Sequence, residues 1–258
     1  MCSSDLGEPL VRPGVIPLLT QLRALDGLQH LVLTTNGLLL SRHAADLATA
    51  GLERINVSID SLRHNRFHDI TRGGSLIEWC RGIDAAEKAG LAVKLNVVVM
   101  AGVNDDEVVD FVRFASQRGW SVRFIEYMPL SGNHYTAVDE QILHERLEQA
   151  GFALTPLPSA KIAGSAREYS VAGTTGKVGF ISARSCPFCR QCNRLRVTAY
   201  GEGRGCLFSC EGINLKPALE AFDDVQLKKH LTRLAAQKPP HYESLSQGGQ
   251  VVMSAVGG

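Results

Sequence analysis

The chain has 258 residues, of which 45% are hydrophobic and 21% are charged, and its formal net charge is +1. This length and apolar content can bury one large core, whereas the balanced charge gives no global attraction for nucleic acid or for an acidic membrane. No apolar run approaches the roughly 20 residues that cross a bilayer, and the chain does not open with a signal peptide pattern. We therefore expect a soluble cytoplasmic protein that binds neither nucleic acid nor membranes.

The first half of the chain repeats a pattern of apolar strand, turn and amphipathic helix. Strands are predicted at 31–37, 54–60, 92–100 and 121–128, and helices at 41–50, 76–89, 104–118 and 139–151. Asn104 to Glu107 is typical of a cap that opens the third helix. Single helices between strands require parallel pairing, because each crossover returns the chain in the same direction. The strands read as apolar runs, as in a sheet covered by helices.

This order predicts an α/β fold, an incomplete TIM-like parallel β/α barrel followed by a C-terminal β-rich and helical region. We assign residues 7–138 to the barrel and 139–258 to the C-terminal region, with a β-rich stretch at 152–184 and a helical one at 216–236. In such barrels the site lies at the C-terminal ends of the strands. The residues there are Thr34, Thr35, Asn36, Ser58, Asp60, Asn96, Glu126 and Met128, although each one taken alone is better explained as a residue that caps a strand or turns the chain.

Five of the seven cysteines crowd into one segment, from Cys186 to Cys210. Dense cysteines in a chain without a secretion signal favour a metal over disulfides. Cys189 and Cys192 form a C-x2-C pair, and Cys206 follows after thirteen intervening residues that include three glycines. Soft thiolates select zinc or iron–sulfur clusters. Zinc would need Cys186 or Cys210 as a fourth ligand, so the spacing favours iron–sulfur and leaves zinc as the alternative.

Five arginines surround these thiolates and only Glu202 opposes them: Arg184, Arg190, Arg194, Arg196 and Arg204. One interpretation is that they offset the negative charge of a cysteine-ligated cluster. The other is that Arg194 and Arg196, two apart on a strand-like run, face one way and grip an anionic substrate, since a guanidinium donates two parallel hydrogen bonds to phosphate. The residues alone do not decide between the two.

Several motifs match one family in order and distance. They are Gly7-Glu-Pro-Leu-Val-Arg12, Leu33-Thr-Thr-Asn-Gly-Leu-Leu-Leu40, Arg54-Ile-Asn-Val-Ser-Ile-Asp60, Val93-Lys-Leu-Asn-Val-Val98, Gly102-Val-Asn-Asp-Asp106, Arg123-Phe-Ile-Glu-Tyr-Met128, Phe188-Cys-x2-Cys-Asn-Arg-Leu-Arg196, Gly205-Cys-Leu-Phe208 and Gly257-Gly258. Over nearly all of residues 7–258 the chain resembles the GTP 3′,8-cyclases, radical S-adenosylmethionine lyases of molybdenum cofactor biosynthesis. The resemblance implies that a radical from S-adenosylmethionine takes the 3′ hydrogen of GTP. The sugar carbon then bonds to guanine C8, giving (8S)-3′,8-cyclo-7,8-dihydroguanosine 5′-triphosphate.

The resemblance also implies roles for individual residues. Cys189, Cys192 and Cys206 would ligate an auxiliary 4Fe–4S cluster whose open iron takes the guanine. GTP would contact Thr34, Lys94, Arg123, Arg194, Leu195 and Arg196, and S-adenosylmethionine would contact Gly7, Ser58 and Met128. Arg194, Arg196 and the terminal Gly257 and Gly258 would serve catalysis. The implied partners are GTP, S-adenosylmethionine, a flavodoxin-like electron donor and the next enzyme of the molybdopterin pathway, and a homodimer is compatible with the family.

One family feature is missing from these residues. The C-x3-C-x2-C motif of the family's first 4Fe–4S cluster does not occur, and Met1 to Leu6 stands where the family shows an apolar strand. We interpret this stretch as a truncation or an artefact. We expect a barrel with an unpaired edge and a chain that is inactive alone. The alternatives are a cluster- and GTP-binding chain without turnover, or another radical S-adenosylmethionine enzyme with an auxiliary cluster.

Overall fold

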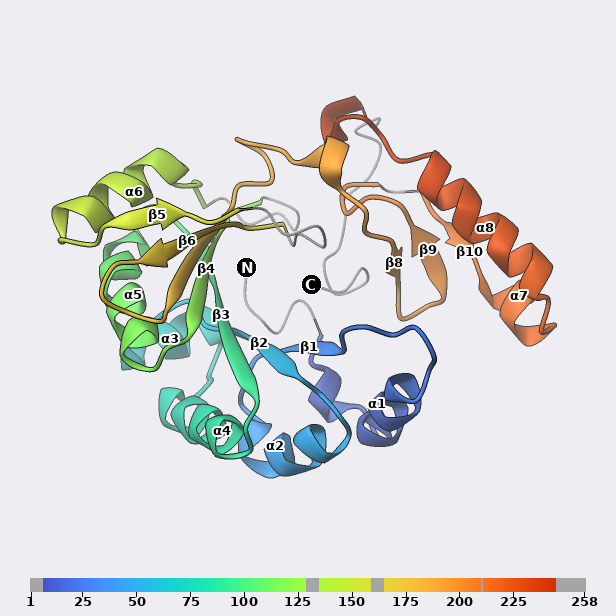
Figure 1. The fold of residues 1–258 in the computed structure, drawn as a ribbon, viewed down its shortest axis with the longest axis horizontal. Helices are drawn as coiled ribbons and strands as arrows, with labels where there is room; N and C mark the ends of the chain where they lie inside the picture. The colour runs from blue at the N-terminus through green and yellow to red at the C-terminus, as the bar shows by residue number, and fades with distance from the viewer. Residues whose placement is uncertain (1–6, 129–134, 159–164, 210, 245–258) are drawn as a thin grey trace. The chain divides into compact units, whose positions relative to one another are not determined.

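The computed structural model describes residues 7–128, 135–158, 165–209 and 211–244 (Figure 1). These residues form two compact units. The first contains 8–128, 135–158 and 165–182, and the second contains Gly7, 183–209 and 211–244. The expected boundary between barrel and C-terminal region lies after residue 138, whereas the first unit continues to Ser182 because the β-rich stretch joins the same sheet. Within the described ranges, no helix is both long enough and apolar enough to cross a membrane.

A seven-stranded sheet organises the first unit, in the order β1-β2-β3-β4-β7-β6-β5. The strands are β1 (Val32–Thr35), β2 (Arg54–Ser58), β3 (Ala92–Val99), β4 (Ser121–Glu126), β5 (Leu154–Pro156), β6 (Arg167–Val171) and β7 (Lys177–Ile181). Neighbours from β1 through β4 to β7 pair in parallel, and β6 and β5 extend the sheet by antiparallel pairing. The predicted α/β class with a mostly parallel sheet is confirmed.

The helices of the first unit follow the strands in chain order. They are η2 (Pro9–Val11), α1 (Val15–Arg23), α2 (Leu40–Thr49), α3 (His64–Thr71), α4 (Leu76–Lys88), η3 (Asp105–Glu107), α5 (Val108–Gln117) and α6 (Glu140–Gln149). α4 packs on β3 and α5 packs on β4 (Figure 1). The prediction covers α2, α4, α5 and α6 but not η2, α1 or α3. α1 and α3 are short, have no side-chain N-cap bond, and α3 buries only Phe67.

The strands alternate between apolar and polar side chains, which corrects the expectation of uniformly apolar runs. In β2, Ile55 and Val57 are fully buried, whereas Arg54, Asn56 and Ser58 are half-buried. Burial alternates in the same way along β3 and through most of β4. Because successive side chains of a strand point to opposite faces, the sheet has an apolar face and a polar face.

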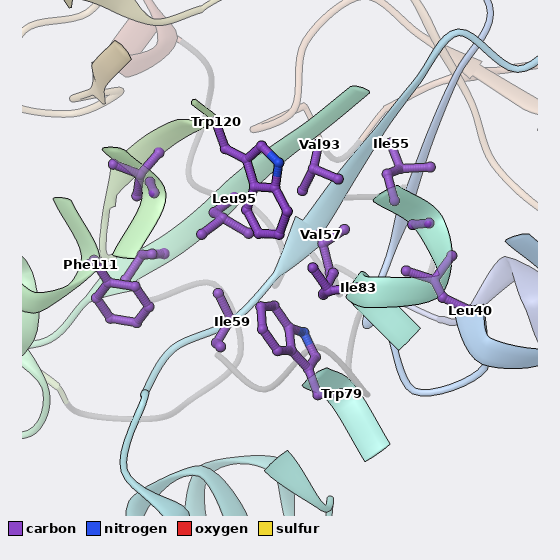
Figure 2. Close-up of a cluster of buried hydrophobic side chains, with 14 of the residues drawn as sticks. Leu40, Ile55, Val57, Ile59, Trp79, Ile83, Val93, Leu95, Phe111 and Trp120 are labelled. Carbon is purple, nitrogen blue, oxygen red and sulfur yellow. The ribbon is translucent and has the colours of Figure 1, made fainter. Parts of the chain in front are cut away.

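The apolar face carries the hydrophobic core. Figure 2 shows side chains from the strands, the helices and the segments next to them meeting there: Ile55, Val57, Ile59, Val93 and Leu95 with Leu40, Trp79, Ile83, Phe111 and Trp120. Burying a side chain of this size contributes about 1.5–3 kcal/mol, so the layer dominates the stability of the unit. Gly37, with φ +84°, lets the turn after β1 approach this layer, because a Cβ there would lie 2.9 Å from Trp79 Cδ1.

Asn104 stands at the N-cap position of η3, as predicted, but its side chain forms no capping bond there. Its Oδ1 accepts a hydrogen bond from the Met100 N–H at 2.8 Å, and its Nδ2 donates to the carbonyls of Asp60 at 2.7 Å and Val98 at 2.9 Å. The side chain is therefore committed to the ends of β2 and β3, and η3 begins without a bond from it. One buried amide thus forms hydrogen bonds with three backbone groups.

The second unit is built on a small antiparallel sheet in the order β10-β9-β8. Its elements are η4 (Cys189–Gln191), β8 (Arg196–Val197), β9 (Glu202–Arg204), β10 (Ile213–Asn214), α7 (Lys216–Glu220), α8 (Asp224–Ala236) and η5 (Tyr242–Ser244). The predicted helical stretch is thus confirmed as two helices. The buried hydrophobic residues in the described part of this unit are Ala183, Leu215, Ala218 and Leu234, a much smaller core than that of the first unit.

Candidate functional site

Polar side chains from neighbouring strands gather on the polar face of the first unit. Thr34 of β1, Asn56 of β2 and Lys94 of β3 stand in register across three adjacent strands. Asn96 and Arg123 are partners between β3 and β4. Asn56 Nδ2 donates to Thr34 Oγ1 at 3.3 Å, and Arg123 Nε donates to Asn96 Oδ1 at 2.9 Å. Three of the residues predicted for GTP therefore share one face of one sheet.

The polar face carries more positive than negative charge. Arg54, Lys94 and Arg123 stand against Glu168 of β6, whose Oε1 lies 2.9 Å from Lys94 Nζ. Burial lowers the pKa of Arg123 to about 10, with repulsion by Arg54 in the same direction and Glu168 opposing it. Burial also raises the pKa of Glu168, but the Lys94 hydrogen bond and the charges of Lys94, Lys177 and Arg123 together hold this pKa below its ordinary value. Both groups are therefore ionised at neutral pH.

Two buried atoms of β2 have no hydrogen-bond partner within the described residues: Arg54 Nε and Asn56 Oδ1. Buried polar atoms in folded proteins are normally satisfied, so such atoms mark a place that a ligand or water completes. Arg54, Asn56 and Glu168 are absent from the predicted site. The alternation Arg54-Ile-Asn-Val-Ser58 carries the signal for the first two. Glu168 has no such signal, because its place beside Lys94 depends on the pairing of distant strands.

The residues predicted for S-adenosylmethionine lie near chain turns. Ser58 ends β2 and is half-buried, and its carbonyl accepts a hydrogen bond from Trp79 Nε1 at 3.3 Å. Met128 follows β4 and is 9% exposed. Gly7 is exposed, has φ +77°, and a Cβ there would meet nothing within 4 Å. The structure places Ser58 and Met128 in the first unit and groups Gly7 with the second.

Glu8 fixes the polar end of β1 and was not predicted as a site residue. Its Oε1 accepts hydrogen bonds from the Leu10 N–H at 3.0 Å and from Thr35 Oγ1 at 2.8 Å, and its Oε2 accepts from the Asn36 N–H at 2.7 Å. Charge-assisted bonds of this kind are among the stronger ones in proteins. Glu8 thereby ties the segment that follows Gly7 to the end of β1.

Cys189 and Cys192 bracket η4 in the second unit. The Cys192 N–H donates to the Cys189 carbonyl at 3.2 Å, and Cys206 follows β9. All three cysteines are half-buried free thiols. Lys238 Nζ lies 3.4 Å from Cys192 Sγ. The sequence gives no indication of this contact, because 46 positions separate the two residues.

Nearby cations act on the Cys192 thiol. Burial raises its pKa, but the hydrogen bond from the Arg194 N–H, the charges of Lys238 and Arg194, and the hydrogen bond from Lys238 outweigh burial and lower the pKa. Burial lowers the pKa of Arg196, and repulsion by Arg194 adds to this, while Cys192 and Cys206 oppose it. Arg196 thus interacts with two of the predicted cluster ligands. The lowered pKa of Cys192 favours its thiolate, which is the form that binds metals.

The segment around Arg194 alternates in burial. Arg194 and Arg196 are half-buried, whereas Leu195 between them is 40% exposed. The Arg194 guanidinium lies over the Phe188 ring, 4.9 Å from its centroid. The two arginines therefore lie on the same side of an extended segment, as the spacing predicts.

Cys189, Cys192 and Cys206 are three free thiols, and cations act on the last two, so this donor set fits an iron–sulfur cluster. In the part of the chain that the structure describes, no three His, Cys, Asp or Glu side chains are grouped to hold a metal ion. A four-iron cluster bonds each thiolate to a different iron, so its ligands stand further apart than those of a single ion. The assignment of Cys189, Cys192 and Cys206 as ligands stays a prediction. Gly257, Gly258, Cys210 and residues 1–6 lie outside the described residues.

Two protein families match this chain when it is compared with known proteins. The Radical SAM superfamily matches residues 6–115, and Molybdenum Cofactor Synthesis C matches residues 120–244. A GTP 3′,8-cyclase of Geobacter sulfurreducens is 46% identical over 92% of this chain and 73% of its own length. Those of Heliobacterium modesticaldum and Moorella thermoacetica are 42% and 40% identical, each over 98% of this chain and 80% of their own length.

The mostly parallel sheet and the match over its first three strands define a radical S-adenosylmethionine protein, a class that uses a 4Fe–4S cluster and S-adenosylmethionine. The second match and the extent of the identities narrow this class. The chain belongs to the GTP 3′,8-cyclase family. The resemblance found in the sequence motifs is therefore confirmed.

Proposed function

We propose that this chain serves the GTP 3′,8-cyclase reaction of molybdenum cofactor biosynthesis, in which the ribose C3′ of GTP is joined to guanine C8. The observation that carries the proposal is the polar face of the first unit. Arg54, Lys94 and Arg123 place three cationic groups there against one carboxylate, and Arg54 Nε is buried without a partner among the described residues. This excess of half-buried cationic groups suits a triphosphate.

On this proposal, Lys94 and Arg123 bind phosphate oxygens and Thr34 orients the nucleotide through its hydroxyl. The partial burial of Lys94 and Arg123 strengthens each interaction, because charges attract more strongly where water is excluded. Arg194, Leu195 and Arg196 are proposed as further GTP contacts. Gly7, Ser58 and Met128 are proposed to bind S-adenosylmethionine, which together with a 4Fe–4S cluster supplies the radical chemistry of the superfamily. Gly257 and Gly258 keep the catalytic role that the family implies.

Cys189, Cys192 and Cys206 would hold an auxiliary 4Fe–4S cluster. With three protein ligands, such a cluster offers one iron to a substrate atom. Lys238 and Arg196 balance the charge of the thiolates that bind it. An electron donor, the next enzyme of the pathway and a homodimer stay predictions of the family resemblance. The cytoplasmic location stays a prediction from the sequence.

Equilibrium binding of GTP to the anaerobically reconstituted chain tests the nucleotide site. Lys94→Met and Arg123→Met are each expected to weaken binding about tenfold or more, since each removes a charged partner of the phosphates. Arg113→Met is the matched control, because Arg113 is an exposed arginine of α5 that pairs with Asp110. Equal affinity in all four proteins would refute the site.

Iron and sulfide analysis tests the cluster ligands. Cys189→Ala, Cys192→Ala and Cys206→Ala are each expected to lose cluster iron and the visible absorption of the cluster, whereas Cys80→Ala in α4 keeps both. Zinc without iron or sulfide in the wild-type chain would overturn the assignment. Neither test requires turnover, which matters because the C-x3-C-x2-C motif does not occur in these 258 residues.

A further inference from the structure

The ion pair between Lys94 and Glu168 spans an unusual distance across the sheet. Lys94 lies on β3 and Glu168 lies on β6, and both β4 and β7 stand between them in the sheet order. Lys94 Nζ nevertheless lies 2.9 Å from Glu168 Oε1, and the two side chains are 20% and 32% exposed, respectively. The pair therefore closes over the polar face, on which Arg123 also lies.

Gly179 of β7 makes room for this arrangement. In register it stands between Arg123 of β4 and Glu168 of β6. A Cβ at this position would lie 3.1 Å from Arg123 Cγ and 3.2 Å from Ala166 Cβ. The stem of Arg123 thus occupies the space of the missing side chain, and the arginine and the ion pair share one patch of the face.

Glu168 supplies negative charge at the place where the proposed function needs a phosphate. Charges of Lys94, Lys177 and Arg123 all act on its carboxylate, and Arg54 acts on Arg123. An ammonium that already pairs with a carboxylate cannot pair fully with a phosphate oxygen as well. A bound triphosphate and the Glu168 carboxylate would also repel each other across a half-buried patch.

We propose that Glu168 is a positioning residue whose carboxylate occupies the place of a substrate phosphate until GTP binds. This proposal rests on the proposed function. The Glu168 carboxylate holds the Lys94 ammonium on the polar face, and the incoming triphosphate takes its place. The carboxylate also makes binding selective, because only a ligand with several negative charges competes well with a carboxylate that is already in contact.

Equilibrium binding of GTP to the full chain tests this proposal. Glu168→Gln keeps the shape and removes the charge, and it is expected to bind GTP about three- to tenfold more tightly at low salt. The gain is expected to shrink as salt rises, because salt screens the charge that was removed. Glu78→Gln is the matched control, since Glu78 is an exposed residue of α4 that pairs with Arg81. It lowers the net negative charge equally and is expected to leave the affinity unchanged.

A double substitution separates this proposal from the proposed function. In a Lys94→Met background, Glu168→Gln is expected to give a clearly smaller gain, because the competition runs through the ammonium. Equal or weaker binding by Glu168→Gln, or an undiminished gain without Lys94, would overturn this role of Glu168. Lys94→Met that binds GTP as well as the wild type would instead refute the nucleotide site itself. Should Glu168→Gln not fold, Glu168→Asp, whose side chain is too short for the same contact, is expected to show the same direction with a smaller size.

Discussion

Glu107 is fully buried, and its carboxylate accepts hydrogen bonds from Ser61 Oγ at 2.8 Å and from the Leu62 N–H at 2.6 Å. Arg66 also donates to it. Removing this carboxylate takes the acceptor away from the Leu62 N–H and the Ser61 hydroxyl and leaves Arg66 paired with Asp106 alone. Losses of this kind cost about 3 kcal/mol in buried networks. We therefore expect Glu107→Ala to lower the free energy of unfolding by about 3 kcal/mol in urea titrations, with an unchanged slope.

Tryptophan fluorescence can follow this transition, because both tryptophans, Trp79 and Trp120, lie in the core of the first unit. Glu78→Ala, at an exposed helix position, is the control and should cost under about 0.5 kcal/mol. A loss for Glu107→Ala no larger than that of the control would show that the network is not structural.

Asp60, which follows β2, is expected to make the stability of the folded chain depend on pH. Burial raises its pKa to about 6, against a weaker opposing effect of the Val98 N–H, which donates to its Oδ1 at 2.8 Å. A folded pKa above the unfolded one means that the stabilising effect is present below about pH 4 and is lost as the pH rises through about 6. Ionisation of Asp60 thus destabilises the folded chain at neutral pH.

Asp60→Asn removes this ionisation and keeps the acceptor oxygen. We expect the advantage of the substituted chain over the wild type, measured as free energy of unfolding, to grow by about 1–3 kcal/mol as the pH rises from about 4.5 to about 7.5. Urea titrations at both pH values measure the difference. Two stability curves that run parallel over this interval would contradict the raised pKa.

At the scale of elements, the contact between α2 and α4 depends on Gly82. A Cβ at this position would lie 2.4 Å from the Gly37 carbonyl oxygen and 3.1 Å from Leu40 Cβ. Gly82→Ala improves helix propensity by about 1 kcal/mol but must push the two helices apart. We expect a net loss of about 1–3 kcal/mol in urea titrations, whereas Arg81→Ala on the exposed side of α4 should change stability by less than about 0.5 kcal/mol.

A gain in stability for Gly82→Ala would mean that the helices can separate without cost. The comparison with Arg81→Ala matters because alanine is favourable in helices at both positions. Alanine is therefore expected to lower stability only at Gly82, where its Cβ would clash with neighbouring atoms.

The same elements show what local sequence can predict. The strands were found as short apolar segments and the longer helices as amphipathic ones, whereas α1 and α3 are the two shortest α-helices of the first unit and α3 buries a single side chain, Phe67. Thr34, Lys94 and Arg123 were found through family motifs, and the sheet register brings them onto one face. Glu168, Lys238 and the strand-end role of Asn104 depend on contacts between distant segments, which no local pattern records.

At the scale of the whole molecule, the two units differ in the size of their cores. Below about 80 residues a small core rarely supplies much stability without a disulfide or a metal. We therefore expect the second unit to open more readily than the first in the chain without metal. Hydrogen exchange should be faster at 183–244 than at the buried strands of the first unit, and anaerobic reconstitution with iron and sulfide should slow it there.

Cys206→Ala is the control for this measurement, because it removes a predicted ligand and should abolish the protection that iron and sulfide confer. Equal exchange in both units before reconstitution would contradict the expected difference in stability. Tryptophan fluorescence should report only the first unit, since neither tryptophan lies in the second.

The seven-stranded sheet has a consequence for how this family can be recombined. β1, β2 and β3 lie within residues 6–115, and β4 to β7 lie within residues 120–244, so the border between the two matched families falls between β3 and β4. These neighbours pair from Lys94 with Ser121 to Val99 with Glu126, and the Lys94–Glu168 ion pair crosses the same border. A chimera joined between β3 and β4 would pair strands from two different parent proteins. A junction after Ser182 would exchange the cysteine segment and keep all seven strands of the sheet from one parent.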